Sequence, residues 1–183
     1  MSSDFAYQGR GGCRCHQQSS GVSRRRLFGL GVGALAAGGI LPRAFAAGGT
    51  DALLLNCIDY RLTGATTRYM EGRGMAGKYD QVVLAGAALG AKNDKFPAWG
   101  TTFWEHVQVA IDLHQIHQII VIDHRDCGAY KVILGKDPKD PREEFALHAA
   151  QMRSLKADIA ARHPKLTVEL LLMGLDGKVE TVA

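Results

Sequence analysis

The sequence has no apolar run long enough to cross a lipid bilayer. Its most apolar stretch near the start, residues 27–41, has 15 residues and includes five glycines. A transmembrane helix needs about 20 apolar residues, and glycine inside a helix destabilises it. A membrane anchor is therefore the weaker interpretation of this stretch. Internal repeats and low-complexity segments are also lacking, and 183 residues fit a single domain.

A pair of arginines in front of this stretch indicates an export signal instead. Arg24 and Arg25 precede the apolar run, and Ala44-Phe45-Ala46 supplies the small residues that a signal peptidase recognises. We expect residues 1–46 to be a twin-arginine signal peptide that is cleaved, and residues 47–183 to be a single domain. The mature protein would be periplasmic or otherwise exported, and it would keep no stable membrane anchor after cleavage.

A marked excess of one charge is also lacking outside the expected signal. Residues 1–46 carry six of the 22 Lys and Arg and one of the 18 Asp and Glu, which leaves 16 basic and 17 acidic residues. The formal net charge of +4 therefore belongs to the signal. A nearly neutral domain gives no reason to expect nucleic acid or an anionic membrane as a partner.

Cysteine is scarce, with four in the whole chain. Cys13 and Cys15 lie in the expected signal, which leaves Cys57 and Cys127 in the mature domain. In an oxidising compartment these two thiols could form a disulfide, and this alternative stays open. A disulfide alone would explain neither the charged residues that follow Cys57 nor the histidine beside Cys127. Twin-arginine export carries folded proteins, so a metal-thiolate site could also form before export.

The order of predicted elements indicates an α/β protein. Short apolar runs predict strands, and apolar residues at helical spacing predict helices. Residues 85–90 are expected to form a close-packed loop, because their glycine spacing matches neither a dinucleotide fingerprint nor a P-loop. We predict a mainly parallel open sheet in the order 2-1-3-4, with a short antiparallel end strand and flanking helices. The expected strands are 52–56, 81–84, 119–122, 168–173 and 178–182, and the expected helices are 63–73, 101–113, 128–134 and 143–162.

Two short motifs follow the first and third predicted strands. Cys57, Asp59 and Arg61 alternate, so they share one face if the chain stays extended. His124 and Cys127 follow the third strand, and Cys127 directly precedes a predicted helix, whose dipole stabilises a thiolate. In the predicted strand order both motifs open onto the switch point of the sheet, where ligands bind. The two motifs are therefore expected to meet.

The residue types at this point suit a catalytic metal. Two thiols and an imidazole form a soft ligand set that favours zinc, and three protein ligands leave a fourth position open. Asp59 is an acceptor when ionised and Arg61 offers a planar set of donors, so their pairing would lower the pKa of the carboxyl group and aim it. A carboxylate held in this way can orient a metal-bound water or take a proton from it.

The combination Cys-x-Asp-x-Arg and His-x-x-Cys-Gly resembles the β-class carbonic anhydrases. The similarity extends to residues 103–110 and 171–182 and covers most of 51–183. The resemblance implies one zinc ion per chain held by Cys57, His124 and Cys127, with Asp59 and Arg61 as the dyad that gates the metal. It further implies reversible hydration of carbon dioxide to bicarbonate by a zinc-bound hydroxide, and a homodimer or a higher homo-oligomer. In some members the aspartate itself occupies the fourth zinc position.

Three features depart from the family pattern. The turn at residues 84–87 has neither the arginine nor the asparagine that members commonly carry, and Asp123 stands where glycine is frequent. The N-terminal helical arm is also expected to be missing. Two alternatives stay open: a related zinc hydrolase acting on carbon disulfide or a similar small molecule, and a non-catalytic zinc-binding relative. Tyr60 is expected to pack away from Cys57 and Asp59, and histidines 106, 114, 117, 148 and 163 are expected to be structural.

Overall fold

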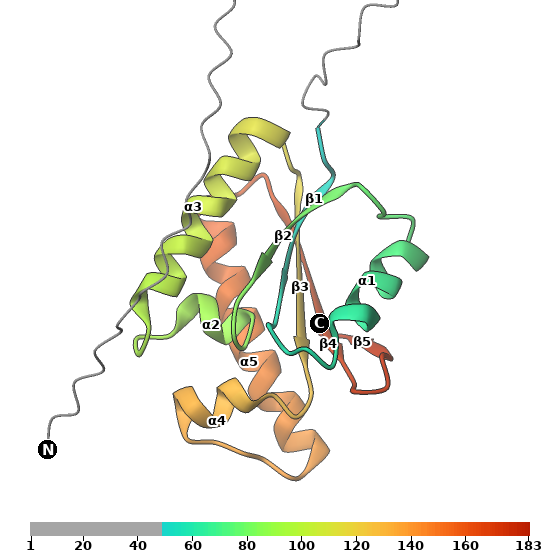
Figure 1. Ribbon diagram of the computed structural model, residues 1–183. Coiled ribbons are helices and arrows are strands. Elements are labelled where there is room, and N and C mark those ends of the chain that lie inside the picture. The colour runs from blue at the N-terminus through green and yellow to red at the C-terminus, as the bar shows by residue number, and fades with distance from the viewer. Residues whose placement is uncertain (1–48) are drawn as a thin grey trace, which may run out of the picture. The chain divides into compact units, whose positions relative to one another are not determined.

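The computed structural model describes residues 49–183, and the predicted signal peptide lies outside the described residues. Helices and strands alternate through this part of the chain (Figure 1). In chain order they are β1 (Ala52–Asn56), α1 (Thr63–Gly72), β2 (Tyr79–Val83), α2 (Ala88–Lys92), α3 (Pro97–His114), β3 (Gln118–His124), α4 (Gly128–Leu134), α5 (Pro141–Arg162), β4 (Thr167–Met173) and β5 (Val179–Thr181).

The strands form one sheet in the order β2-β1-β3-β4-β5. β1 pairs in parallel with β2 and with β3, β3 pairs in parallel with β4, and β5 runs antiparallel to β4. The predicted α/β class, the strand order and the antiparallel end strand are therefore confirmed. All five residues of β1 are buried, as expected of a central strand in a parallel sheet that is covered on both faces.

Helices cover the two faces of this sheet unequally. α1 lies on one face, and α2, α3 and α5 lie on the other (Figure 1). Successive side chains of β1 alternate between these faces: Leu53 and Leu55 pack in the larger apolar cluster with Phe103 of α3, and Leu54 packs in the smaller cluster with Met70 of α1. Burying each such side chain contributes roughly 1.5–3 kcal/mol.

Two long helices begin earlier than predicted. α5 begins at Pro141 because Asp140 caps it: the Asp140 carboxylate accepts hydrogen bonds from the backbone N–H groups of Arg142 at 2.8 Å and Glu143 at 3.1 Å. α3 begins at Pro97, since proline is pre-organised for a first helical turn and loses no hydrogen bond there. The helix continues through Gly100.

The segment after β2 differs from the prediction. β2 covers Tyr79–Val83 rather than 81–84. The chain leaves the sheet after Leu84, whose N–H still donates to the Asn56 carbonyl at 3.0 Å. The predicted loop at 85–90 was wrong in its second half, because α2 begins at Ala88. The small residues of α2 let it pack closely between α3 and α5, a tertiary effect that local pattern does not reveal.

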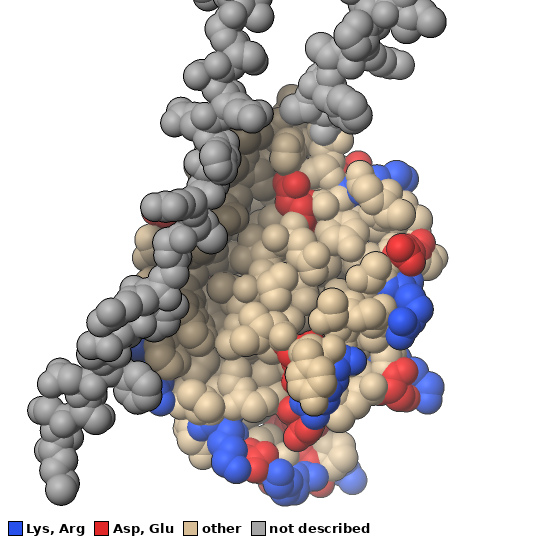
Figure 2. All heavy atoms as spheres, viewed as in Figure 1, with Lys and Arg blue, Asp and Glu red and all other residues tan. Residues whose placement is uncertain are grey.

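The surface of the described part carries charge unevenly. The face in Figure 2 is uncharged over much of its centre, and Lys, Arg, Asp and Glu lie mainly along its margin. Exposed apolar side chains include Val83 of β2 and Val109 and Leu113 of α3. Among the described residues, none of the helices has both the length and the apolar character that crossing a bilayer requires.

Candidate metal centre

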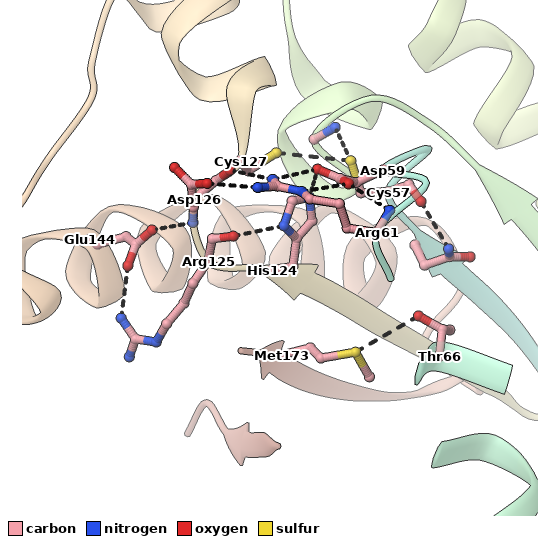
Figure 3. A network of polar contacts seen from close by, with 12 residues as sticks. Cys57, Asp59, Arg61, Thr66, His124, Arg125, Asp126, Cys127, Glu144 and Met173 are labelled. Carbon is pink, nitrogen blue, oxygen red and sulfur yellow. Dashed lines mark hydrogen bonds and ion pairs between the residues drawn. The ribbon is translucent and has the colours of Figure 1, made fainter. Parts of the chain in front are cut away.

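The two cysteines and the histidine singled out from the sequence meet at one point. Cys57 follows β1, His124 ends β3 and Cys127 caps the start of α4. Since β1 and β3 are paired parallel neighbours, their carboxyl ends reach the same edge of the sheet. One ligand atom from each of the three residues lies within 4.8 Å of the others, close enough to hold a metal ion (Figure 3). The predicted convergence of the two motifs is confirmed.

His124 is oriented as a ligand would be. Its side chain is 2% exposed, and its Nδ1 lies 2.8 Å from the carbonyl oxygen of Arg125. A carbonyl only accepts, so Nδ1 carries a proton, and in the neutral ring Nε2 offers its lone pair. Nε2 is buried and has no hydrogen-bond partner. Buried polar atoms without a partner are uncommon, and coordination of a metal ion would satisfy this one.

The pKa values of the two thiols are shifted in opposite directions. The Sγ atoms of Cys57 and Cys127 are 3.9 Å apart, and both are free thiols rather than a disulfide. The hydrogen bond from Cys127 lowers the pKa of Cys57 to about 4, with further lowering by His124 and by the N–H of Gly86, while burial opposes the shift. The same hydrogen bond and burial raise the pKa of Cys127. A pair that already holds one thiolate suits a soft cation such as zinc.

Asp59 and Arg61 form the predicted pair. Arg61 Nε donates to Asp59 Oδ1 at 2.9 Å and Nη2 donates to Oδ2 at 2.7 Å, and the Arg61 backbone N–H also donates to Oδ1 at 3.0 Å (Figure 3). These bonds hold the pKa of Asp59 at about 2. Asp59 Oδ2 lies 3.7 Å from His124 Nε2. The charged carboxylate is therefore beside the candidate metal position.

A second carboxylate, absent from the sequence prediction, also binds Arg61. Asp126 Oδ2 accepts from Arg61 Nη1 at 2.8 Å, and the Asp126 carbonyl accepts from Nη2 at 3.0 Å. Asp126 has a φ of 56°, a conformation that asparagine and aspartate tolerate better than most residues. Its place between His124 and Cys127 made it a candidate, but Arg125 also stands there and binds Glu144 and Glu180, so position alone did not single out Asp126.

The conformation of Asp126 is itself supported by a salt bridge. Glu144 Oε1 accepts from the Asp126 N–H at 2.5 Å, and Glu144 Oε2 accepts from Arg125 Nη1 at 3.0 Å. Arg125 also contacts Glu180 of β5. Glu144 lies on α5 and could not be assigned to this site from spacing in the sequence. These contacts tie the loop between β3 and α4 to α5 and to the sheet.

Tyr60 does not pack as predicted. Its side chain is 87% exposed. β1 ends at Asn56, and the chain turns where the Leu62 N–H donates to the Asp59 carbonyl at 3.1 Å. Strict alternation between two faces therefore stops before Tyr60, so no opposite buried face is available to it.

A cleft of about 250 Å³ opens onto the cluster. Its polar side chains are Cys57, Asp59 and Cys127, and the rest of its wall is apolar or glycine. Trp99 of α3 is part of this wall. The wall is completed by Ile58, Ala85, Gly128, Ala129, Val132 and Ile133. The arrangement admits a small uncharged molecule beside two thiols and an ionised carboxylate.

The family model described as "Putative carbonic anhydrase" matches residues 47–183. The chain belongs to this carbonic anhydrase family. Within the part compared, it is 40% identical over 131 residues to an uncharacterized protein of Rickettsia conorii, covering 71% of this chain and 70% of the relative. It is 37% identical over 131 residues to an uncharacterized protein of Rickettsia bellii, covering 71% and 80%.

The fold is shared with β-carbonic anhydrases. A crystal structure of a tetrameric β-carbonic anhydrase from the filamentous ascomycete Sordaria macrospora superposes with a TM-score of 0.50 at 12% sequence identity, covering 74% of this chain and 82% of the other. At this identity the comparison shows the fold alone. The resemblance inferred from the cysteine and histidine motifs is thus confirmed at the level of family and fold.

Proposed function

We propose that this member of the carbonic anhydrase family is a zinc-dependent carbonate dehydratase that interconverts carbon dioxide and bicarbonate. One zinc ion per chain would be held by Cys57, His124 and Cys127. The observation that carries the proposal is the buried, unpartnered Nε2 of His124, which lies with two thiols at one point beside the arginine-bound carboxylate of Asp59. Zinc bound there supplies Lewis acidity, which makes water a nucleophile near neutral pH.

Asp59 would orient the reacting water. Asp59 Oδ1 already accepts two hydrogen bonds from Arg61, whereas Oδ2 accepts one and can still accept a hydrogen bond from water. Arg61 keeps the carboxylate ionised and holds both of its oxygens. A hydrogen bond from water to Asp59 would turn a lone pair of the water oxygen toward the carbon of the substrate. The dyad thus supplies orientation, because a carboxyl group with a pKa of about 2 is too weak a base to keep a proton taken from water.

Arg61 would also keep Asp59 away from the fourth metal position. Asp59 would have to break two charge-assisted hydrogen bonds with Arg61 to become a ligand, and Arg61 is itself held by Asp126. Such bonds are roughly twice as strong as neutral ones. We therefore propose that water, rather than Asp59, occupies the fourth position.

The apolar cleft fits carbon dioxide, which is small, linear and uncharged. Its wall offers few competing hydrogen-bond partners, so polar contact is concentrated at Asp59. The same wall would also admit carbon disulfide, which makes hydrolysis of that molecule the second candidate function. Assays with the two substrates separate these possibilities. A non-catalytic zinc protein would bind the metal and turn over neither.

The deciding experiment combines metal analysis with stopped-flow hydration of carbon dioxide. Residues 47–183, made in a reducing cytoplasm, should contain about one zinc per chain. Hydration should exceed the uncatalysed rate and depend on the zinc content. A protein without zinc whose Cys57 and Cys127 are oxidised to each other would contradict the proposal.

We also propose that the protein is exported by the twin-arginine route to the periplasm. The support is the arginine pair before the apolar stretch at residues 27–41. Replacing Arg24 and Arg25 together by lysine in the full chain should leave the unprocessed protein in the cytoplasm, as fractionation and immunoblotting would show. Processing at an unchanged rate would contradict this route.

A homo-oligomer is proposed for the same chain. The support is the uncharged face in Figure 2 together with exposed apolar side chains such as Val83, Val109 and Leu113. Sedimentation velocity on residues 47–183 should show a dimer or a larger species at micromolar concentration. A single monomeric species would contradict it.

A further inference from the structure

We propose that Asp123 is a positioning residue for the metal centre: its carboxylate holds the turn at residues 84–88 so that the Gly86 N–H faces the Cys57 sulfur. The inference rests on the proposed zinc site. It concerns a buried group of polar side chains that the proposed reaction does not use. The group consists of Asp123, Tyr130 and His148, called here the buried hub.

The carboxylate of Asp123 is 1% exposed. Its Oδ1 accepts from the Ala88 N–H at 3.0 Å, and its Oδ2 accepts from the Tyr130 hydroxyl at 2.6 Å. His148 Nδ1 lies 3.0 Å from Oδ2. An unpaired buried carboxylate would be costly, so these partners compensate for its burial. Burial also raises the pKa of Tyr130 well above its usual value, which keeps its hydroxyl a donor.

The partners of Asp123 come from three separate helices. Ala88 begins α2, Tyr130 lies on α4 and His148 lies on α5. Asp123 itself directly precedes His124 on β3. One side chain therefore fixes the spacing between the strand that carries a ligand and the helices around it. Any hydrogen-bond donors could satisfy a buried carboxylate. Here two of the three partners, Ala88 and Tyr130, lie next to segments that contact the metal centre, so the same hydrogen bonds also position that centre.

The turn that Asp123 holds has a strained backbone. Gly86 has a φ of 78°, and Ala87 has a φ of 39° and a ψ of −101°. A residue with a Cβ is strained in such a conformation, which persists only where the surroundings enforce it. Ala87 precedes α2 but offers no capping side chain. Asp123, from another strand, accepts the hydrogen bond of the first residue of that helix instead.

The position of this turn determines whether a backbone N–H reaches the Cys57 sulfur. The Gly86 N–H donates to Cys57 Sγ at 3.3 Å. A Cβ added at Gly86 would lie 3.0 Å from the Ala129 Cβ, so the turn is also packed against the start of α4. N–H groups directed at a metal-binding thiolate stabilise its charge and fix its orientation. If the turn moved away, Cys57 would lose its one backbone donor.

The turn at residues 84–87 reads Leu-Ala-Gly-Ala. The hydrogen bond from Ala88 to Asp123 ties it to the strand that carries His124. We infer that the aspartate supplies the support for a turn that has no polar side chain of its own.

The test compares side-chain truncation with an isosteric change. Asp123→Ala removes the acceptor for Ala88, and Asp123→Ser leaves a hydroxyl too short to reach it. Zinc affinity, measured by competition with a chelator, should weaken about 10- to 100-fold in both, the range found when groups that orient metal ligands are removed. Asp123→Asn keeps an oxygen toward Ala88, but its amide nitrogen would meet the Tyr130 hydroxyl, so Tyr130→Phe is added to remove that donor. The zinc affinity of this double variant should stay within about threefold of the parent. His114→Gln, which loses a hydrogen bond to Asp80 outside the metal centre, is the matched control.

A second substitution separates positioning from general stability. Ala87→Gly removes the strain that the turn carries, because glycine adopts a positive φ freely. Added to Asp123→Ala, it should restore about tenfold of the lost zinc affinity. With cobalt in place of zinc, the sulfur-to-cobalt charge-transfer band should shift in Asp123→Ala and return toward the parent in the double variant. A purely structural role would change the melting temperature without moving this band.

The outcomes separate this inference from the proposed function. If the parent binds no zinc, the proposed function fails and takes the inference with it. If the parent binds zinc and a folded truncation binds it within threefold, the inference alone is overturned. It is also overturned if the folded Asp123→Asn, Tyr130→Phe double variant weakens zinc binding as much as tenfold, because the charge of the hub would then matter rather than its contact with Ala88.

Discussion

Two aspartates flank the candidate metal centre, and they are held in opposite ways. The Asp59 side chain is 15% exposed and is bound by a cationic partner, Arg61. Asp123 is 1% exposed, and its partners are a backbone N–H, a phenol and an imidazole. A carboxylate at a solvent-accessible rim can meet water and substrate, whereas a carboxylate sealed among helices can only fix geometry. The difference supports the two proposed roles, a chemical one for Asp59 and a positioning one for Asp123.

Metal removal should have the largest effect on hydration, because without the ion neither aspartate can contribute to the reaction. Dialysis of the folded protein against a strong chelator should abolish hydration while far-ultraviolet circular dichroism keeps its helical signal, because the two apolar clusters do not depend on the ion. Zinc added back should restore activity. Collapse of the circular dichroism signal on chelation would show that the ion holds the fold together.

The zinc-free protein should also become sensitive to oxidation. The sulfurs of Cys57 and Cys127 are 3.9 Å apart, whereas a disulfide needs about 2.0 Å, so a small movement would join them. Mild oxidant should remove two hydrogens from the zinc-free protein, as intact mass spectrometry would show. The zinc-loaded protein should resist under the same conditions. Equal oxidation of both forms would contradict coordination by these thiols.

Substitution of Asp59 or Arg61 should lower hydration activity without lowering the zinc content. Asp59→Asn keeps the shape of the side chain but removes its charge, so hydration should fall about 10²- to 10³-fold while zinc stays near one per chain. Arg61→Ala should behave similarly because Asp59 would lose its support. Stopped-flow hydration and metal analysis of the same preparation measure both quantities. Unchanged turnover in both variants would remove the dyad from the mechanism.

Asp126 should have a smaller effect that acts through Arg61. Asp126→Asn suits the positive φ of this position but weakens the charge-assisted contact with Arg61. We expect kcat/KM for hydration to fall about tenfold, with zinc affinity unchanged. Asp126→Gly, which also tolerates the backbone conformation, should lose slightly more. Values within twofold of the parent for both variants would show that the Asp126 side chain is not needed to hold Arg61.

The outer end of α2 should matter least. Lys92 Nζ donates to Ser154 Oγ at 2.7 Å and contacts Asp158 on α5. Such partly exposed pairs contribute little, about 0–1 kcal/mol. Lys92→Met should therefore keep zinc affinity and hydration within twofold. A tenfold loss of zinc affinity would show that α2 is positioned from this end rather than from Asp123.

The three candidate ligands and the Asp59–Arg61 pair were easier to predict from the sequence than the buried hub. Cys57, Asp59 and Arg61 are close in the chain, which was enough to place them together, although a turn after Asp59 rather than an extended segment brings Arg61 to Asp59. The distant pair His124 and Cys127 was placed by strand order, which the sheet confirms. These inferences needed only periodicity, ligand chemistry and a rule about parallel sheets.

The hub could not be predicted, because its contacts join residues that no pattern links. His148 was expected to be structural, and it is buried, but its contact with Asp123 depends on how α5 packs on the sheet. Glu144 reaches Asp126 for the same reason. The strained turn at Ala87 was also hidden, because alanine gives no local sign of a positive φ. Tertiary packing decides each of these features.

The pairing of β1 with β3 has a consequence for how the protein matures. Asn56 lies opposite Ile122 in the sheet, and a slip of one residue would turn the side chains to the opposite face. Cys57 and Cys127 are 70 positions apart in the chain, so the donors meet only after these strands have paired. A newly made chain would therefore gain its high affinity for metal late in folding. The metal content of a preparation would then report the fraction of molecules in which β1 and β3 are correctly paired.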